Sequence, residues 1–248
     1  MERQVFAFSG VLAPRSGERG NLPLLEHVLE LGRTRWLWEG AVRLCYLPTA
    51  IGDDSTAIAA YEQVFGDRED VELSVLRLFP HPSVPEPRKH LLRQDVVLVE
   101  GGSLVNLLAV WRAHGVDEAL AECWEEGVVL AGAGAGGQVW HAGGPTTSWS
   151  ADRLEPCADG LALLPYSNGV HHDSPGRLRA PYRRMVANGE LPPGYATEDG
   201  VGLHYVGAEL AEAVTVREKA RAWHLAPNGH GGCREQPVPA RLIRRRPS

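Results

Sequence analysis

Several features that would readily assign a function are missing from this sequence of 248 residues. No two of its four cysteines form a CxxC pair, which excludes a zinc ribbon and a thioredoxin-type motif. No apolar run approaches the ~18 residues that a transmembrane helix needs, and the first residues, MERQVFAFSGV, contain no apolar core of a signal peptide. We therefore expect a soluble, cytoplasmic protein that does not interact with a membrane.

Positive charge is also in short supply. The sequence has 25 lysines and arginines against 31 aspartates and glutamates, so its net charge at pH 7 is −6. This balance is unfavourable for a general nucleic-acid binder, and we expect no nucleic-acid partner. With 44% hydrophobic residues, the chain can bury enough surface to fold without disulfides or structural metals.

What the sequence does contain is an alternation of buried strands and amphipathic helices. The clearest strands are predicted at 42–47, 95–99 and 127–131, and the clearest helices at 22–31, 103–114 and 117–126. This alternation is typical of a mostly parallel sheet covered by helices on both faces. We therefore predict a single α/β domain with three αβα layers over residues 1–233. Residues 234–248, which end in RLIRRRPS, are predicted to form a basic tail that could be disordered.

A glycine-rich turn, GAGAGG, occupies residues 132–137 after a predicted strand. Its glycines satisfy the GxGxxG pattern of dinucleotide-binding proteins, but that pattern also requires a long helix after the turn. The sequence GGP at 143–145 would end such a helix early. The same residues fit a nucleophile elbow, GxSxG, which is a sharp strand-to-helix turn, with Gly134 in place of the serine. We favour the elbow.

Several longer segments resemble a known family. In chain order they read PTAIGD, QDVVLVEGGS followed by VNLLAVWRAHGVDEAL, GVVLAGAGAG, LLPYSNGVHHDS and YATEDGVGLHY. Through these segments the chain resembles the peptidase E family of serine peptidases, which includes aspartyl dipeptidases and cyanophycinases. The resemblance extends from about Gln4 to Trp223. It implies the core that this family shares with class I glutamine amidotransferases, a flavodoxin-like fold.

The resemblance also implies which positions would form an active site. The family's nucleophilic serine falls on Gly134, its histidine on His171, and its acidic residue on Thr147 in the segment GGPTTSW. Serine-type acyl transfer needs a nucleophile, a base and a group that orients the base. The chain keeps the base alone, so we expect that it does not use the family's serine chemistry.

Further contacts are implied in the loop that resembles the family's VGGGST, which here reads VEGGSL at 99–104. Glu100 replaces a glycine of that pattern. The resemblance implies anion contacts from Gly101, Gly102 and Ala135. It implies substrate contacts from Ser103, Thr147, Arg177 and Arg179. One of the two arginines is expected to bind a substrate carboxylate, because a guanidinium suits bidentate recognition; alternatively, both lie on an exposed helix face.

Glu100 and His171 are the remaining candidates for chemistry. A carboxylate in a glycine-rich loop beside a pocket is costly to bury without a role. Together with a nearby imidazole it could form an acid/base pair. Two plainer interpretations stay open: Glu100 points into solvent, and His171 is a hydrogen-bonded core histidine.

Neither histidine-rich segment predicts a metal centre. Adjacent histidines on a strand, such as His171 and His172, point to opposite faces. The spacing of His224, His230 and Cys233 fits no compact zinc pattern. We expect neither a metal nor a cofactor.

These observations favour a peptidase E homologue that lacks the catalytic serine. We expect a repurposed non-serine enzyme or a ligand-binding protein. Its ligand would be a small carboxylate-bearing molecule or an aminoacyl or peptide-like compound, with a biosynthetic pathway as one setting. Two alternatives remain open. One is an aspartyl dipeptidase in which Gly134 is an inactivating change, and the other is a catalytically dead interaction subunit, for example of a homodimer.

Overall fold

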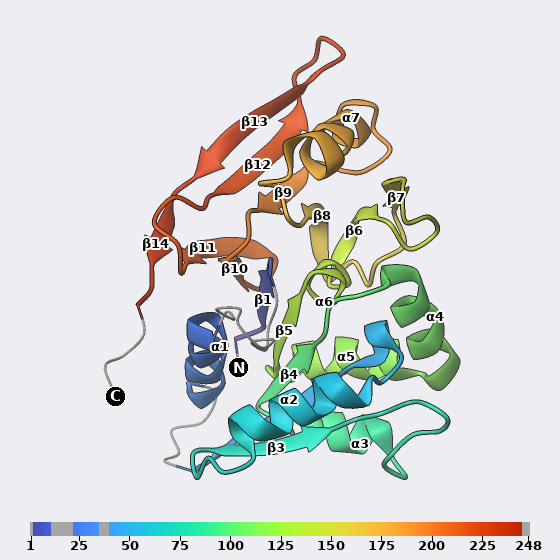
Figure 1. Ribbon diagram of the computed structural model, residues 1–248, viewed down its shortest axis with the longest axis vertical. Helices are drawn as coiled ribbons and strands as arrows, with labels where there is room; N and C mark the ends of the chain where they lie inside the picture. Colours follow the sequence, from blue (N-terminus) through green and yellow to red (C-terminus); the bar gives the residue numbers. More distant parts are fainter. Residues whose placement is uncertain (1, 11–21, 35–39, 245–248) are drawn as a thin grey trace.

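The computed structural model describes residues 2–10, 22–34 and 40–244 (Figure 1). Within these residues, eight strands form one sheet in the order β14-β11-β10-β1-β5-β4-β2-β3. Neighbours from β1 to β3 are parallel, whereas β10 runs antiparallel to β1 and to β11. The bounds are β1 Gln4–Phe8, β2 Val42–Leu47, β3 Val71–Val75, β4 Val96–Val99, β5 Val129–Ala133, β10 Val201–Val206, β11 Glu209–Thr215 and β14 Ala240–Leu242.

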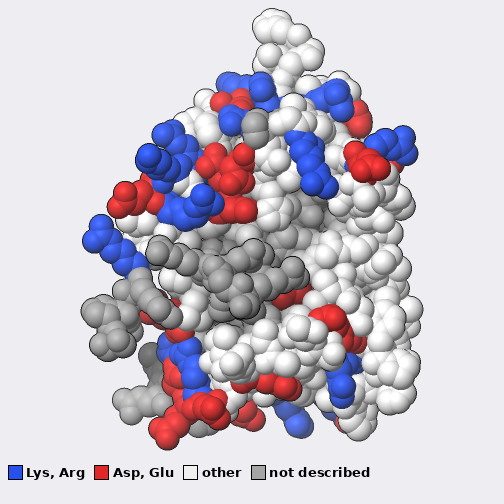
Figure 2. Space-filling view, viewed as in Figure 1, with Lys and Arg blue, Asp and Glu red and all other residues white. Residues whose placement is uncertain are grey.

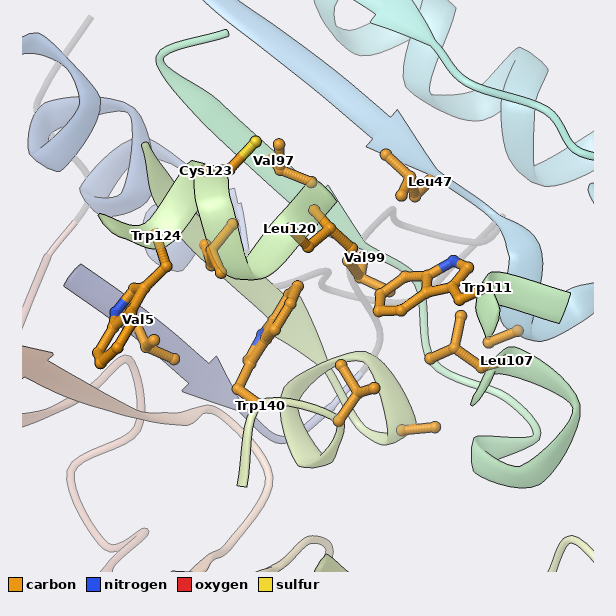
Figure 3. Packing of buried hydrophobic residues seen from close by; sticks show 14 of the residues in the cluster. Val5, Leu47, Val97, Val99, Leu107, Trp111, Leu120, Cys123, Trp124 and Trp140 are labelled. Atoms are coloured by element: carbon orange, nitrogen blue, oxygen red, sulfur yellow. The ribbon is translucent and has the colours of Figure 1, made fainter. Parts of the chain in front are cut away.

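Helices cover this sheet on both faces. They are α1 Leu22–Arg33, the 3-10 turn η1 Thr49–Ile51, α2 Ser55–Phe65, α3 Pro87–Leu92, α4 Leu104–His114, α5 Val116–Glu125 and the short α6 Ala135–Gln138. Successive residues of β4 alternate between two hydrophobic clusters: Val97 and Val99 pack with α4 and α5 around Trp111 (Figure 3), whereas Val96 and Leu98 pack with α1 and α2. A strand buried on both faces is what a parallel sheet requires. The α/β layering predicted from the sequence is confirmed.

A second sheet is present that the sequence did not predict. Among the described residues it has six strands in the order β13-β12-β9-β8-β6-β7, and Figure 1 places it above the first sheet. Their bounds are β6 His141–Thr146, β7 Glu155–Cys157, β8 Leu164–Gly169, β9 Gly194–Thr197, β12 Ala222–Pro227 and β13 Cys233–Val238. The turn η2, Pro175–Arg179, and the helix α7, Ala180–Ala187, connect β8 to β9.

The C-terminal segment forms strands, so the prediction of a tail from residue 234 is wrong for most of its length. β13 pairs antiparallel with β12, and β14 pairs parallel with β11. β13 lies at the edge of its sheet, and none of its residues is fully buried. Its sequence, CREQPV, therefore lacks the apolar alternation that identifies a half-buried strand. Residues 245–248 lie outside the described part of the chain.

The surface carries both signs of charge. On the face shown in Figure 2, basic and acidic side chains lie next to one another, above and below the centre of the molecule. Among the described residues on that face, the basic side chains therefore form no continuous area of the kind that follows a phosphate backbone. Over the described ranges, every helix is too short or too polar to span a bilayer.

Candidate active site

Gly134 forms a sharp turn between β5 and α6. Its backbone angles are φ 53 and ψ −122, and its N–H donates to the carbonyl of Phe8 at the end of β1 (3.0 Å). Side-chain-bearing residues rarely adopt this conformation. The turn has the strand-to-helix form expected of a nucleophile elbow. α6 has four residues, so the long helix that a dinucleotide fingerprint needs is absent here.

A side chain would fit at this turn. A Cβ atom added to Gly134 would meet one neighbour within 4 Å, the Cα of Gly101 at 3.6 Å, which is an ordinary contact. The flanking glycines differ, because a Cβ on Gly132 would lie 2.0 Å from the carbonyl oxygen of Gly136, and a Cβ on Gly136 would lie 2.3 Å from that of Val99. Packing therefore requires glycine on either side of residue 134, whereas the space at 134 itself is open.

His171 is paired with a carboxylate that the sequence did not assign. Its Nδ1 atom hydrogen-bonds to Asp199, in the turn between β9 and β10. The hydrogen bond to Asp199 raises the pKa of His171, although burial opposes this shift, and the same bond lowers the pKa of Asp199. The family resemblance had implied that the acidic residue of the site would fall at Thr147, judged by its distance along the chain from Gly134. Asp199 lies in the segment YATEDGVGLHY, and its position between two strands was the signal that could have identified it.

Ser9 connects the histidine to the elbow. The buried Ser9 Oγ accepts the backbone N–H of His171 at 3.1 Å and lies 2.6 Å from the hydroxyl of Thr197 in β9. The preceding residue, Phe8, accepts the N–H of Gly134. The backbone N–H of Gly134 is thus bonded to Phe8, the last residue of β1, and that of His171 to the next residue, Ser9. His171 has φ 52, the left-handed region, and its side chain is 42% exposed. It is therefore not the enclosed core histidine of the plainer interpretation.

Thr147 lies elsewhere. It is exposed in the turn after β6, and its carbonyl accepts the N–H of Ser150. The next residue, Ser148, accepts the N–H of Val105 in the first turn of α4 at 3.3 Å. Within the described residues no hydrogen bond joins Thr147 to His171, so its expected substrate contact stays a prediction.

Glu100 is held against the protein by hydrogen bonds to both of its carboxylate oxygens. The hydroxyl of Tyr46 donates to Oε2 at 2.7 Å, and the backbone N–H of Gly101 donates to Oε1 at 3.0 Å. Burial and the neighbouring Glu100 carboxylate raise the pKa of Tyr46, so its hydroxyl remains a donor. This geometry does not fit a glutamate that points freely into solvent. The Gly101 amide, for which an anion contact was expected, is therefore already bonded to a carboxylate of the protein itself.

The remaining residues of the loop VEGGSL at 99–104 lead into α4. The N–H of Ser103 donates to Ala50 of η1 at 2.9 Å, and its hydroxyl accepts the N–H of Asn106 as the N-cap of α4. Gly102 has φ 147, and a Cβ there would lie 2.3 Å from the Ala50 carbonyl oxygen. Ala135 is buried as the first residue of α6. Of the loop residues, Gly101 lies next to the elbow, whereas the Ser103 hydroxyl is already used as a helix cap.

The two candidate arginines have different surroundings. Arg179 donates through Nε and Nη2 to Glu235, at 3.2 and 2.6 Å, and lies over the ring of Trp223. Arg177 is exposed and donates to the carbonyl of Ala151 at 3.4 Å, with no carboxylate partner in the described part of the chain. Arg179 is therefore neutralised within the protein, and Arg177 is the candidate that remains for a substrate carboxylate.

Two large apolar side chains near this site are exposed, and sequence reasoning did not single them out. Ile51 is 36% exposed, and its Cγ2 atom lies 2.9 Å from where a Cβ on Gly102 would be. Trp149 is 53% exposed and follows Ser148, which contacts α4. The described residues contain no group of three or more histidine, cysteine, aspartate and glutamate side chains arranged to hold a metal ion.

Comparison with known proteins agrees with this geometry. The sequence profile of peptidase family S51 matches residues 16–213. The uncharacterized peptidase YgaJ of Bacillus subtilis (strain 168) is 32% identical over 241 residues, covering 97% of this chain and 99% of that protein. The chain also superimposes on two crystal structures. A peptidase from an acI-B1 Actinobacterium has a TM-score of 0.65 at 18% identity, covering 97% of this chain and 95% of that one.

A protein of Listeria monocytogenes EGD-e described as peptidase E has a TM-score of 0.58 at 16% identity, covering 88% of this chain and 100% of that one. At these identities the two structures support the fold alone. The family assignment rests on the profile match and on the sequence identity to YgaJ. The chain belongs to peptidase family S51, the peptidase E family.

Proposed function

We propose that this S51 family member works without a serine nucleophile, as an acid/base hydrolase of a small acyl or peptide-like compound that bears a carboxylate. One observation carries the proposal. Gly134 keeps the elbow backbone conformation with open space at its side-chain position, while His171, which is bonded to Ser9 next to the Phe8 partner of Gly134, keeps a carboxylate partner. A decayed site would have no reason to retain both.

The proposed reaction consumes one water molecule. His171 accepts a proton from the water, and the water oxygen attacks the carbonyl carbon of an ester or amide. The tetrahedral intermediate then collapses, the bond to the leaving group breaks, and the imidazolium returns its proton to that group. Asp199 orients the imidazole and stabilises its charged form, as a carboxylate does in a triad. The open space at Gly134 would admit the water near the position of the missing side chain.

The substrate class follows from the side chains that border the site. Arg177 is the exposed guanidinium near the loop that carries His171, and a carboxylate is its natural partner. Ile51 and Trp149 offer exposed apolar surface, Ile51 next to Gly102 and Trp149 next to Ser148, which contacts the first turn of α4. We infer a substrate with a carboxylate at one end and a short apolar acyl portion.

A second candidate function is ligand binding without turnover. The observation in its favour is the hydrogen bond from the Gly101 amide to Glu100, which removes a donor that could stabilise an oxyanion. The distinction is experimental, because a binding protein would hold the same carboxylate-bearing compound without hydrolysing it.

The test uses the mono-4-nitrophenyl ester of glutaric acid, an activated acyl compound with a free carboxylate. We expect saturable hydrolysis that His171→Gln lowers by at least about 100-fold, the usual contribution of a general base. Gly134→Ala should also lower the rate, because its methyl group takes the space proposed for the water. His230→Gln, in an exposed turn, is the matched control and should leave the rate unchanged.

Two results would contradict the proposal. One is hydrolysis that survives His171→Gln within a factor of about two. The other is labelling by a fluorophosphonate probe that mass spectrometry traces to a serine beside the elbow. Binding of glutarate without hydrolysis of its ester would favour the second candidate function.

A further inference from the structure

The residue after the candidate base is anchored in the protein interior. The N–H of His172 donates to the carbonyl of Thr197 at 3.0 Å, and its side chain is 1% exposed. Its Nε2 atom hydrogen-bonds to Glu235 of β13. Burial lowers the pKa of His172 despite that carboxylate, so the neutral ring donates Nε2–H to Glu235. The side chain of His172 is therefore fixed by the C-terminal hairpin.

Glu235 binds the other end of the same loop as well. Its carboxylate accepts two hydrogen bonds from Nε of Arg179, both at 3.2 Å, and one from Nη2 at 2.6 Å. Its side chain is 8% exposed. Burial opposes its ionisation, but the hydrogen bonds from Arg179 and His172 hold the pKa of Glu235 below its ordinary value. One buried carboxylate thus joins both ends of the segment 172–179.

We propose that Glu235 is a positioning residue for the His171–Asp199 pair. It acts through the loop, because it clamps His172, the residue next to His171, and Arg179 at the loop's far end. His171 has φ 52, a conformation that a side-chain-bearing residue adopts only when its surroundings impose it. The clamp on one side and Ser9 on the other impose it here. This inference rests on the proposed role of His171, although its test does not require a substrate.

The charges that act directly on His171 come from other residues. Asp199 faces it from the turn between β9 and β10, and Asp173 lies on the same loop as His171. Arg217, beyond β11, donates to the backbone carbonyl of Asp199 and lies 3.8 Å from Asp173. Glu235 is not among the charges that shift the pKa of His171. An effect of Glu235 on the pKa of His171 would therefore arise from a change in the conformation of the loop.

The experiment is an NMR titration of the His171 imidazole in the full chain, with Glu235→Asp as the main variant. This change keeps the charge but shortens the side chain, so it separates position from electrostatics. We expect it to weaken the bond to Asp199 and so lower the pKa of His171 by at least about 0.5 units. The Nδ1–H signal should broaden, and Glu235→Gln should act in the same direction.

Glu212 offers a matched control. It also binds an arginine of a neighbouring strand, Arg241, and lies 3.7 Å from a histidine, His27, far from the loop. Glu212→Asp should leave the His171 titration unchanged. Folded Glu235→Asp and Glu235→Gln proteins with an unaltered His171 pKa and Nδ1–H signal would overturn the inference.

A second pair of variants decides the matter if the Glu235 variants do not fold. His172→Phe removes the donor to Glu235, whereas His172→Gln keeps an amide donor of similar reach. His172→Phe should lower the His171 pKa and His172→Gln should not; equal titrations would overturn the inference. Because these readouts need no substrate, an inactive protein would contradict the proposed function and leave the positioning role to be judged on the titration.

Discussion

The backbone N–H of Gly101 donates a hydrogen bond to the carboxylate of Glu100, the residue immediately before it, at 3.0 Å. The other carboxylate oxygen accepts the hydroxyl of Tyr46 from β2. An amide beside the elbow, where an oxyanion would need a donor, is thus turned toward an internal anion. We propose that the serine route is obstructed at two places, because residue 134 is a glycine with no side chain to act as nucleophile and the Gly101 amide is already hydrogen-bonded.

This double obstruction predicts how the serine chemistry can be rebuilt. Gly134→Ser alone should react slowly with a fluorophosphonate probe and cleave Asp-X dipeptides poorly. Adding Glu100→Gly frees the Gly101 amide, and one oxyanion donor contributes about 100-fold or more to turnover. We expect the double variant to exceed the single variant by at least about tenfold in labelling rate. A single variant as reactive as the double would mean that Glu100 does not block the site.

A side chain at residue 134 also has a cost in stability. The backbone conformation there, φ 53 and ψ −122, is strained for any residue with a Cβ. Such strain costs roughly 1–3 kcal/mol, while the open space means that no steric penalty is added. Gly134→Ser and Gly134→Ala should therefore lower the free energy of unfolding by similar amounts in urea titrations. A stabilised variant would contradict the backbone geometry described for this turn.

The α/β core could be predicted because its strands are buried on both faces. The run at 95–99, for example, has no polar alternation, and it appears in the structure as β4 in the interior of the first sheet, between β5 and β2. β13 could not be predicted in this way, because an edge strand in contact with solvent has no apolar pattern. The second sheet was missed for a related reason, since β7 and β9 have only three and four residues.

The candidate site was only partly accessible to sequence reasoning. His171 and Gly134 were predicted as site positions because they fall in long segments that resemble the family. Asp199 was not, because its partnership with His171 depends on the turn between β9 and β10 and not on spacing from the elbow. Arg179 was offered as a substrate contact because its neutralisation by Glu235 becomes visible only once β13 is placed against η2.

The two arginines should behave differently when substituted. Arg177→Ala removes an exposed side chain and should change the free energy of unfolding by less than about 0.5 kcal/mol, while weakening binding of glutarate and of its ester. Arg179→Met leaves a buried carboxylate without its arginine and should destabilise the fold by roughly 2–3 kcal/mol. Urea titrations and glutarate binding by calorimetry measure both effects. Equal loss of glutarate binding in two equally stable variants would contradict the assignment.

The pH dependence of hydrolysis should reflect His171. The imidazole must be neutral to accept a proton, and the hydrogen bond to Asp199 raises its pKa above the ordinary 6.5. The rate should therefore increase as the pH rises through a midpoint above 6.5. Asp199→Asn removes the partner, so it should lower both the rate and the midpoint. A midpoint in the wild type below 6.5 would show that another group limits the reaction.

Stability in acid should depend on a different histidine, His141 at the start of β6. Its side chain is fully buried, and its Nδ1–H donates to the carbonyl of Gly137 while Nε2 lies 3.3 Å from the hydroxyl of Tyr205. Burial lowers its pKa to about 4, although the bond to Gly137 opposes the shift. The ring is therefore neutral in the folded protein over a range in which the unfolded chain would protonate it.

The sign of the effect follows from that difference. Between pH 6.5 and about 4 the unfolded state binds a proton that the folded state does not, so this contribution is complete above pH 6.5 and falls as the pH falls. For His141 the loss amounts to roughly 3 kcal/mol by pH 4. Urea titrations at several pH values should show it. His141→Asn, which keeps an amide donor toward Gly137, should be less stable at pH 7 but lose less stability in acid. His230→Asn should follow the wild type, and parallel curves for His141→Asn and the wild type would exclude His141 as the group responsible.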